Sequence, residues 1–177
     1  MLSAAFVLEK AMFKPSIKIH RVTDITADVL IQKNIKALIL DVDNTLSTHH
    51  GMELVFGLED WIRTMQNEGI RLLILSNSKE RRVKPFAEKI GLDFCSLGLK
   101  PLPFGYMKAK KRLKLKRREI AIVGDQMFTD VLGGRLFGIT TIMTDLILPE
   151  DKISFKVRRK MEKILLKKMK VENGYGC

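Results

Sequence analysis

The chain has 177 residues, of which 46% are hydrophobic and 29% are charged. This length and balance are typical of one globular domain with a buried core, and they exclude a disordered chain. No apolar run reaches the ~20 residues that a bilayer-spanning helix requires. The two cysteines, Cys95 and Cys177, lack the spacing of a metal site, so we interpret both as reduced thiols of a cytoplasmic protein.

The formal net charge of +12 is unevenly distributed along the chain. Residues 108–118 contain eight basic side chains and no acidic one, whereas residues 151–177 contain nine basic and three acidic side chains. The rest of the chain is close to neutral. Two such segments attract phosphate-rich partners, including nucleic acid, anionic lipid headgroups and charged substrates. Each segment by itself is also compatible with a solvated helix face.

Predicted strands and helices alternate along the chain. Short continuous apolar runs predict buried strands, and longer segments that end at a glycine predict helices. Pro85 is expected to break or restart its helix. This alternation predicts an α/β fold, a Rossmann-like three-layer α/β/α sandwich around a central five-stranded parallel sheet. In chain order, the elements are strand 36–42, helix 58–68, strand 71–76, helix 79–90, strand 92–96, helix 104–115, strand 119–123, helix 129–137 and strand 139–144.

Polar side chains follow four of the predicted strands. The first strand ends in Asp41 and Asp43, and two carboxylates so close together require a cation or a shared proton. An Asp-x-Asp pair by itself is equally compatible with an ordinary acidic turn. The carboxyl ends of parallel strands meet at one edge of a sheet, where open α/β folds bind their ligands. The other strand ends bring Ser76, Asn77, Lys100, Asp125 and Asp130 to the same edge.

These residue types together predict a chemistry. Carboxylate oxygens with room for water suit Mg²⁺, and a lysine and a serine beside them suit a phosphate group. The simplest reaction for this set is phosphoryl transfer from a substrate to a carboxylate, with a metal ion neutralising the charge between them.

Four segments resemble the four motifs of the haloacid dehalogenase superfamily of phosphatases. They are Asp-Val-Asp-Asn-Thr, Ile-Leu-Ser-Asn-Ser, Leu-Lys-Pro and Gly-Asp-Gln-Met-Phe-Thr-Asp, which begin at residues 41, 74, 99 and 124. The resemblance implies that Asp41 is the nucleophile, which forms an aspartyl-phosphate. It also implies that Asp43 is the general acid and base.

The same resemblance implies the ligands of the site. Mg²⁺ would be held by the side chains of Asp41 and Asp125 and by the main-chain carbonyl of Asp43. The transferring phosphoryl group would be bound by Ser76 and Lys100 with the help of Asn77. Asp130 would steady Lys100 or a metal-bound water from the second coordination shell.

The spacing of the motifs leaves no room for a cap domain. Only 32 residues separate Asp43 from Ser76, and 23 separate Ser76 from Lys100. We therefore expect an open site, which favours a substrate large enough to cover it, such as a protein, a nucleic-acid end or a lipid headgroup.

A closer resemblance is to the phosphatidylglycerophosphate phosphatases of capless subfamily III. It rests on Ser-Asn-Ser-Lys-Glu-Arg-Arg-Val-Lys-Pro-Phe-Ala at residues 76–87 and on Gly133-Gly134. It implies removal of the terminal phosphate of phosphatidylglycerophosphate, which gives phosphatidylglycerol for phospholipid biosynthesis. The chain departs from the family at Ser78, where an asparagine is usual.

The resemblance and the charge pattern divide the chain into three parts. Residues 1–35 are an apolar or amphipathic lead-in, 36–150 are the catalytic domain, and 151–177 are a basic amphipathic helix and tail. The helix, over 155–169, would lie on an anionic membrane or pack on the domain. We therefore expect a cytoplasmic, peripherally membrane-associated enzyme of undetermined oligomeric state.

Two other functions remain open from the sequence. One is a phosphatase of the same mechanism that acts on nucleotides, sugar phosphates or a phosphoprotein. The other is a basic protein that binds RNA or ribosomes and carries a vestigial site. The complete motif set argues against a vestigial site, and the scarcity of aromatic residues in both basic segments makes nucleic acid a less favoured partner.

Overall fold

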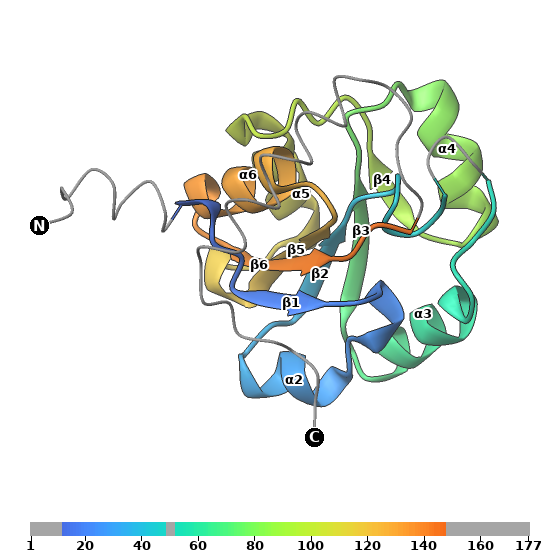
Figure 1. The fold of residues 1–177 in the computed structure, drawn as a ribbon, viewed down its shortest axis with the longest axis horizontal. Helices are drawn as coiled ribbons and strands as arrows, with labels where there is room; N and C mark the ends of the chain where they lie inside the picture. Colours follow the sequence, from blue (N-terminus) through green and yellow to red (C-terminus); the bar gives the residue numbers. More distant parts are fainter. Residues whose placement is uncertain (1–11, 49–51, 148–177) are drawn as a thin grey trace, which may run out of the picture.

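Six parallel strands form one central sheet in the computed structural model, which describes residues 12–48 and 52–147 (Figure 1). The order across the sheet is β1-β6-β5-β2-β3-β4. Strands β2 and β5 are buried along their whole length, as expected where helices cover both faces of a parallel sheet. The strands are β1 (Ile17–Ile19), β2 (Ala37–Leu40), β3 (Arg71–Leu75), β4 (Asp93–Cys95), β5 (Ile120–Gly124) and β6 (Thr140–Thr144).

The predicted α/β class is confirmed, whereas the predicted count of five strands is wrong. The additional strand, β1, pairs with β6 at the edge of the sheet, with Ile17 opposite Ile142. Its sequence is Ile-Lys-Ile, and three residues of alternating character lack the continuous apolar run that marks the interior strands.

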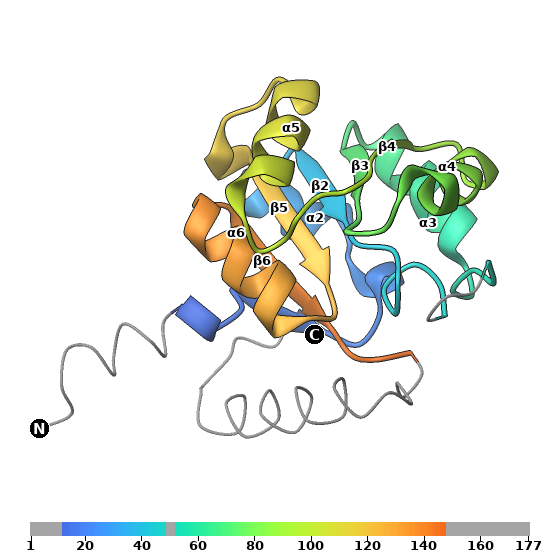
Figure 2. The same cartoon turned by 90° about the horizontal axis from the view of Figure 1, so that it is seen from above.

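Helices cover both faces of the sheet and make the predicted three layers (Figure 2). The alternating side chains of β2 show the division, because Leu38 and Leu40 pack towards α3 and α4 while Ala37 and Ile39 pack towards α5 and α6. The helices are α2 (Ala27–Gln32), α3 (Leu58–Asn67), α4 (Glu80–Lys89), α5 (Pro103–Leu113) and α6 (Leu132–Phe137), with short helical turns η1 (Val22–Asp24), η2 (Arg117–Glu119) and η3 (Met127–Val131).

Helix α4 continues through Pro85, contrary to the expected break. Proline removes only one main-chain hydrogen bond from the helix, the one to the carbonyl of Arg81 in the first turn. On the other side of the helix, Val83, Phe86 and Ala87 are buried in the core. Packing of this apolar face stabilises the helix more than the missing bond weakens it.

The arrangement of the strands determines where the site lies. Strand β2 is in the middle of the sheet, and its neighbours β3 and β5 lie on opposite sides. Leu40, the last residue of β2, pairs with Ile74 of β3 and Val123 of β5. The three strands therefore end at the same level, at the point where the strand order reverses, which is the usual ligand site of open α/β sheets.

No cap domain interrupts the part of the chain that the structure describes between β2 and β4. Within residues 12–48 and 52–147, no helix is long and apolar enough to cross a membrane. The predicted basic helix over 155–169 lies outside the described residues.

Candidate active site

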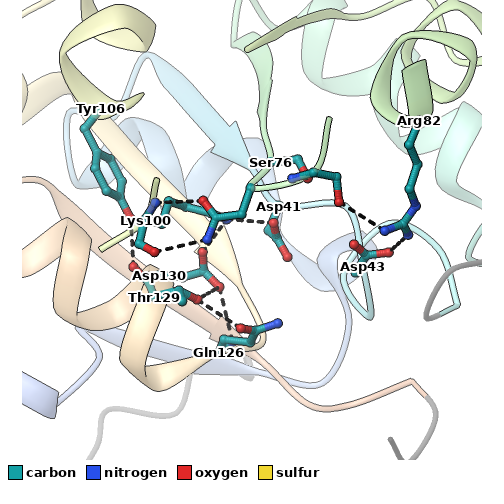
Figure 3. A network of polar contacts seen from close by, with 11 residues as sticks. Asp41, Asp43, Ser76, Arg82, Lys100, Tyr106, Gln126, Thr129 and Asp130 are labelled. Carbon is teal, nitrogen blue, oxygen red and sulfur yellow. Dashed lines mark hydrogen bonds and ion pairs between the residues drawn. The ribbon is translucent and has the colours of Figure 1, made fainter. Parts of the chain in front are cut away.

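Lys100 links two buried carboxylates at the carboxyl edge of the sheet (Figure 3). Its Nζ donates hydrogen bonds to Oδ1 of Asp41 and Oδ1 of Asp130, each at 2.6 Å. Asp41 follows β2 directly, and its main-chain N–H continues the sheet by donating to the carbonyl of Val123 at 2.9 Å. Asp41 and Lys100 each keep 6% of their surface exposed, and Asp130 keeps 1%. The structure therefore brings Asp41, Lys100 and Asp130 together at one edge of the sheet, as the sequence predicts.

Burial and neighbouring charges determine the protonation of this cluster. Burial raises the pKa of Asp41 to about 7, against the lowering effect of Lys100 and with a further rise from Asp130. For Lys100, burial alone would lower the pKa, but the carboxylates of Asp130 and Asp41 outweigh it and hold the pKa above its ordinary value. Lys100 is therefore a permanent ammonium group at neutral pH. It can bind and orient anions through its charge and its N–H groups.

Three buried carboxylates make this cluster a fit for a divalent cation. Oxygens of Asp41, Asp125 and Asp130 all lie within 4.8 Å of one another. When all three are ionised, the ammonium of Lys100 balances only one of the negative charges. A hard cation that prefers oxygen ligands, such as Mg²⁺, would balance the remaining negative charge. Asp125 follows β5 as Asp41 follows β2, so both predicted side-chain ligands lie together.

The side chain of Asp43 points away from this cluster towards helix α4 (Figure 3). It forms an ion pair with Arg82, whose other terminal nitrogen donates a 3.0 Å hydrogen bond to Oγ of Ser78. The predicted metal ligand at this position was the main-chain carbonyl of Asp43, which this side-chain contact leaves untested. The sequence prediction did not include Arg82, although Arg82 lies in the segment 76–87 that carries the closer family resemblance.

Ser76 and Asn77 begin the loop after β3. Ser76 is buried, and its Oγ accepts a 3.1 Å hydrogen bond from the main-chain N–H of Ser78. The amide of Asn77 exchanges two bonds with the main chain of Lys100, donating to its carbonyl at 3.0 Å and accepting from its N–H at 2.7 Å. Asn77 was predicted to help bind phosphate. In this structure its side chain positions the loop that carries Lys100.

Two glycines let Asp130 and Tyr106 pack closely against the main chain of the site. A Cβ at Gly124 would lie 2.4 Å from Cγ of Asp130, and a Cβ at Gly133 would lie 2.5 Å from Oη of Tyr106. Tyr106 is completely buried and donates a 3.0 Å hydrogen bond to the carbonyl of Thr129. The sequence analysis does not predict Tyr106 as a site residue, although Gly133, which Tyr106 contacts, belongs to the distinctive Gly133-Gly134 pair.

Replacing Gly124 by alanine tests this close approach. The added methyl group must displace the carboxylate of Asp130 and loosen its bond to Lys100. We expect Gly124→Ala to destabilise the protein by about 1–3 kcal/mol, the usual cost of overpacking a close-packed site, and to lower the phosphate-release activity that the sequence predicts. Chemical denaturation and phosphate release measure the two effects. An unchanged midpoint with full activity would contradict the tight Gly124–Asp130 contact.

Comparison with known proteins identifies the class of protein that carries this site. The family model described as haloacid dehalogenase-like hydrolase matches residues 48–138, and the model described as mitochondrial PGP phosphatase matches residues 2–90. The chain belongs to the haloacid dehalogenase-like hydrolases. Within that family it is an enzyme of the phosphatase class.

Particular relatives agree with this class. The chain is 33% identical over 161 residues to "Probable phosphatase YqeG" of Bacillus subtilis, covering 91% of this chain and 94% of that protein. It is 24% identical over 172 residues to "Phosphatidylglycerophosphate phosphatase 1, chloroplastic/mitochondrial" of Arabidopsis thaliana, covering 92% of this chain but only 49% of that protein.

One solved structure confirms the fold. The crystal structure of an uncharacterized protein from Listeria monocytogenes serotype 4b aligns with a TM-score of 0.53 and 16% identity, covering 75% of this chain and 99% of that one.

Proposed function

We propose that this phosphatase hydrolyses phosphomonoesters through an aspartyl-phosphate on Asp41, and that its substrate is phosphatidylglycerophosphate at a membrane surface. The observation that carries the chemistry is the buried cluster of Asp41, Lys100, Asp125 and Asp130. A carboxylate nucleophile held by an ammonium group beside further carboxylates suits transfer of a phosphoryl group to a carboxylate.

Two aspartates would carry out the proposed reaction. Lys100 holds Oδ1 of Asp41, which orients Oδ2 for attack on phosphorus. As the new O–P bond forms, the bond to the substrate alcohol breaks. Asp43, which would take up a proton from solvent when its ion pair with Arg82 is broken, gives that proton to the leaving oxygen. Asp43 then takes a proton from a water molecule that attacks the aspartyl-phosphate. This step releases phosphate and restores Asp41.

Mg²⁺ would be held by the side chains of Asp41 and Asp125 and the main-chain carbonyl of Asp43, and it would neutralise charge between nucleophile and phosphate. Lys100 and Ser76 would hold the phosphate oxygens. Asp130 would keep Lys100 in place through the 2.6 Å hydrogen bond between their side chains.

A cavity beside Asp43 supports a substrate with a second anionic group. The cavity measures about 260 Å³, and its lining includes Asp43, Arg81 and Arg82. Because Asp43 would protonate the leaving oxygen, the leaving alcohol would lie on this side of the site. Arginines bind phosphate oxygens through paired hydrogen bonds. The lining also contains apolar residues, which would contact the glycerol carbons: Val42, Met52, Val83, Pro85 and Phe86.

The contact between Arg82 and Asp43 then has a role in the reaction. A phosphodiester that binds Arg82 would compete with Asp43 for the guanidinium group and release the carboxyl group towards the leaving oxygen. The terminal phosphate and the phosphodiester of phosphatidylglycerophosphate are separated by one glycerol, which suits neighbouring subsites. The similarity to the phosphatidylglycerophosphate phosphatase family model over residues 2–90 agrees with this assignment.

A phosphate-release panel tests the substrate. We expect the full chain with Mg²⁺ to hydrolyse phosphatidylglycerophosphate in mixed micelles at least about tenfold more efficiently than nucleotides or sugar phosphates, since one charged contact is worth about 1.5–3 kcal/mol. The deacylated headgroup is the matched control for the acyl chains. Equal or greater activity on sugar phosphates or nucleotides would refute the lipid assignment and favour a phosphatase of small metabolites.

A further inference from the structure

Five large apolar side chains are exposed beside the active site, over the loop between β4 and α5 and the start of α5. More than half of each side chain's surface is open to solvent. We call this group the apolar rim, and it consists of Leu97, Leu99, Leu102, Phe104 and Met107. Single exposed apolar residues are ordinary, but five within eleven consecutive residues indicate an interaction surface.

The backbone of the loop makes these leucines unusual. Leu97 and Leu99 have φ angles of 49° and 51°, in the left-handed region that a bulky side chain rarely adopts. Burial does not compensate for this conformation, because the two side chains are 57% and 55% exposed. Asparagine or glycine would suit both positions better in an isolated domain. An apolar contact outside the domain accounts for leucine there.

The loop is also fixed rather than loosely attached. The N–H groups of Leu97 and Gly98 donate to the carbonyls of Ser78 and Ser76 at 3.0 and 2.9 Å. Gly98 and Gly105 approach so closely that a Cβ at Gly105 would lie 2.3 Å from the Gly98 carbonyl oxygen. The same main chain that positions Lys100 therefore holds the leucines outward.

The charge around the apolar rim favours an anionic surface as its partner. On helix α5, Phe104 and Met107 are followed by Lys108 and Lys111 at the spacing of one helix face, and both lysines are exposed. Residues 94–118 contain no acidic side chain. Apolar side chains bordered by lysines are typical of helices and loops that insert to the headgroup level of anionic bilayers.

Other partners fit this surface less well. A second copy of the chain would bring two strongly basic segments together, and like charges repel. Nucleic acid binds through aromatic side chains on which bases stack, whereas three of the five members of the rim are leucines.

We infer that the apolar rim is the surface by which the protein docks on an anionic membrane, with the active-site edge towards the lipid. This inference rests on the proposed lipid substrate and identifies the surface that would present it. Leu99 and Leu102 flank Lys100 in the chain, and the N–H of Leu102 donates to the carbonyl of Leu99 at 2.8 Å. A headgroup would therefore reach Lys100 and Asp41 while its acyl chains remain in the bilayer.

Vesicle co-sedimentation of the full-length chain tests the docking surface. The double variant Leu97→Asn/Leu99→Asn removes two apolar side chains and supplies a residue that tolerates positive φ. We expect its apparent affinity for phosphatidylcholine vesicles containing phosphatidylglycerol to fall by at least about tenfold, given the apolar area withdrawn from the bilayer. Its unfolding temperature should equal or exceed that of the wild type, which would exclude loss of binding through misfolding.

The matched control is Ile31→Gln. Ile31 is as exposed as Leu99 but lies on α2, before the amino end of β2 and away from the active-site edge. This variant should bind the vesicles like the wild type. The inference would be overturned by any of three results. These are equal loss of binding in both variants, retained binding in the asparagine variant, and wild-type binding that does not depend on phosphatidylglycerol. A dimer in gel filtration that only the asparagine substitutions dissociate would instead assign the rim to self-association.

Activity separates failure of this inference from failure of the proposed function. If the docking surface is correct, the ratio of activity on vesicle-borne phosphatidylglycerophosphate to activity on its deacylated headgroup falls in the asparagine variant. If the wild type hydrolyses neither compound, the lipid function is refuted, and the sedimentation result still decides whether the rim binds membranes.

Discussion

Asp41→Asn is expected to reduce phosphate release by at least about 10⁴-fold, because an amide oxygen cannot replace the carboxylate that we propose as the nucleophile. Asparagine has nearly the same shape, and it still offers an oxygen to Lys100, which donates to Oδ1 of Asp41 at 2.6 Å. The loss should therefore lie in kcat, and the fold should remain intact. Phosphate release under saturating substrate with Mg²⁺ measures it.

The same substitution should change the pH dependence of stability in a defined direction. The pKa of Asp41 is raised from 3.8 to about 7, first by burial. Between these pH values the folded protein without metal keeps a proton that the unfolded chain has lost. The associated stabilisation is present at and below pH 3.8 and disappears as the pH rises through 7. Asp41→Asn removes this effect, so its unfolding temperature in EDTA at pH 8 should exceed that of the wild type, with a smaller difference at pH 4.

Addition of Mg²⁺ supplies the control for both expectations. A ligand that binds only the folded state raises the unfolding temperature, so Mg²⁺ should stabilise the wild type more than Asp41→Asn. Retained turnover in the variant would refute Asp41 as the nucleophile. Equal stabilisation of the two proteins by Mg²⁺ would instead remove Asp41 from the metal site.

Much of this site was predictable from the sequence because its residues lie at the ends of short apolar runs. Such runs indicate buried parallel strands from the local sequence alone. The carboxyl ends of parallel strands lie at the same edge of the sheet, even where the predicted bounds of a strand are off by a residue or two. Asp41, Ser76 and Asp125 each follow the last residue of a strand in the structure. Their convergence required only the order of the elements and the parallel direction of the sheet.

Features that depend on tertiary packing were not predictable in this way. Strand β1 has three residues and depends on β6, more than a hundred residues later, for its hydrogen bonds. The ion pair between Asp43 and Arg82 joins residues 39 positions apart, and it depends on side-chain conformations that no local pattern encodes. The exposed leucines at positive φ contradict local preference. Conflicts of that kind are expected at functional surfaces.

Lys100→Met should have the largest effect on stability. It keeps the apolar stem but removes the ammonium group that bonds Asp41 and Asp130, and it leaves buried carboxylates without their cation. Breaking a buried ion pair in this way costs about 3–5 kcal/mol. Urea denaturation at pH 7 without metal measures the loss. The loss should shrink at acidic pH, because protonated carboxyl groups no longer repel one another.

A second substitution separates charge from packing in this expectation. Asp130→Asn in the Lys100→Met background removes one of the buried carboxylates that have lost their cation. If Lys100 and Asp130 interact directly, the double variant should recover at least about half of the lost stability. Activity should not recover, because the ammonium group that we propose to bind the phosphate is still missing. Lys84→Met is the control, since Lys84 is exposed and its Nζ lies 3.9 Å from Glu88, and such surface pairs contribute at most about 1 kcal/mol. If Lys100→Met and Lys84→Met cost the same, the buried cluster is not held together by Lys100.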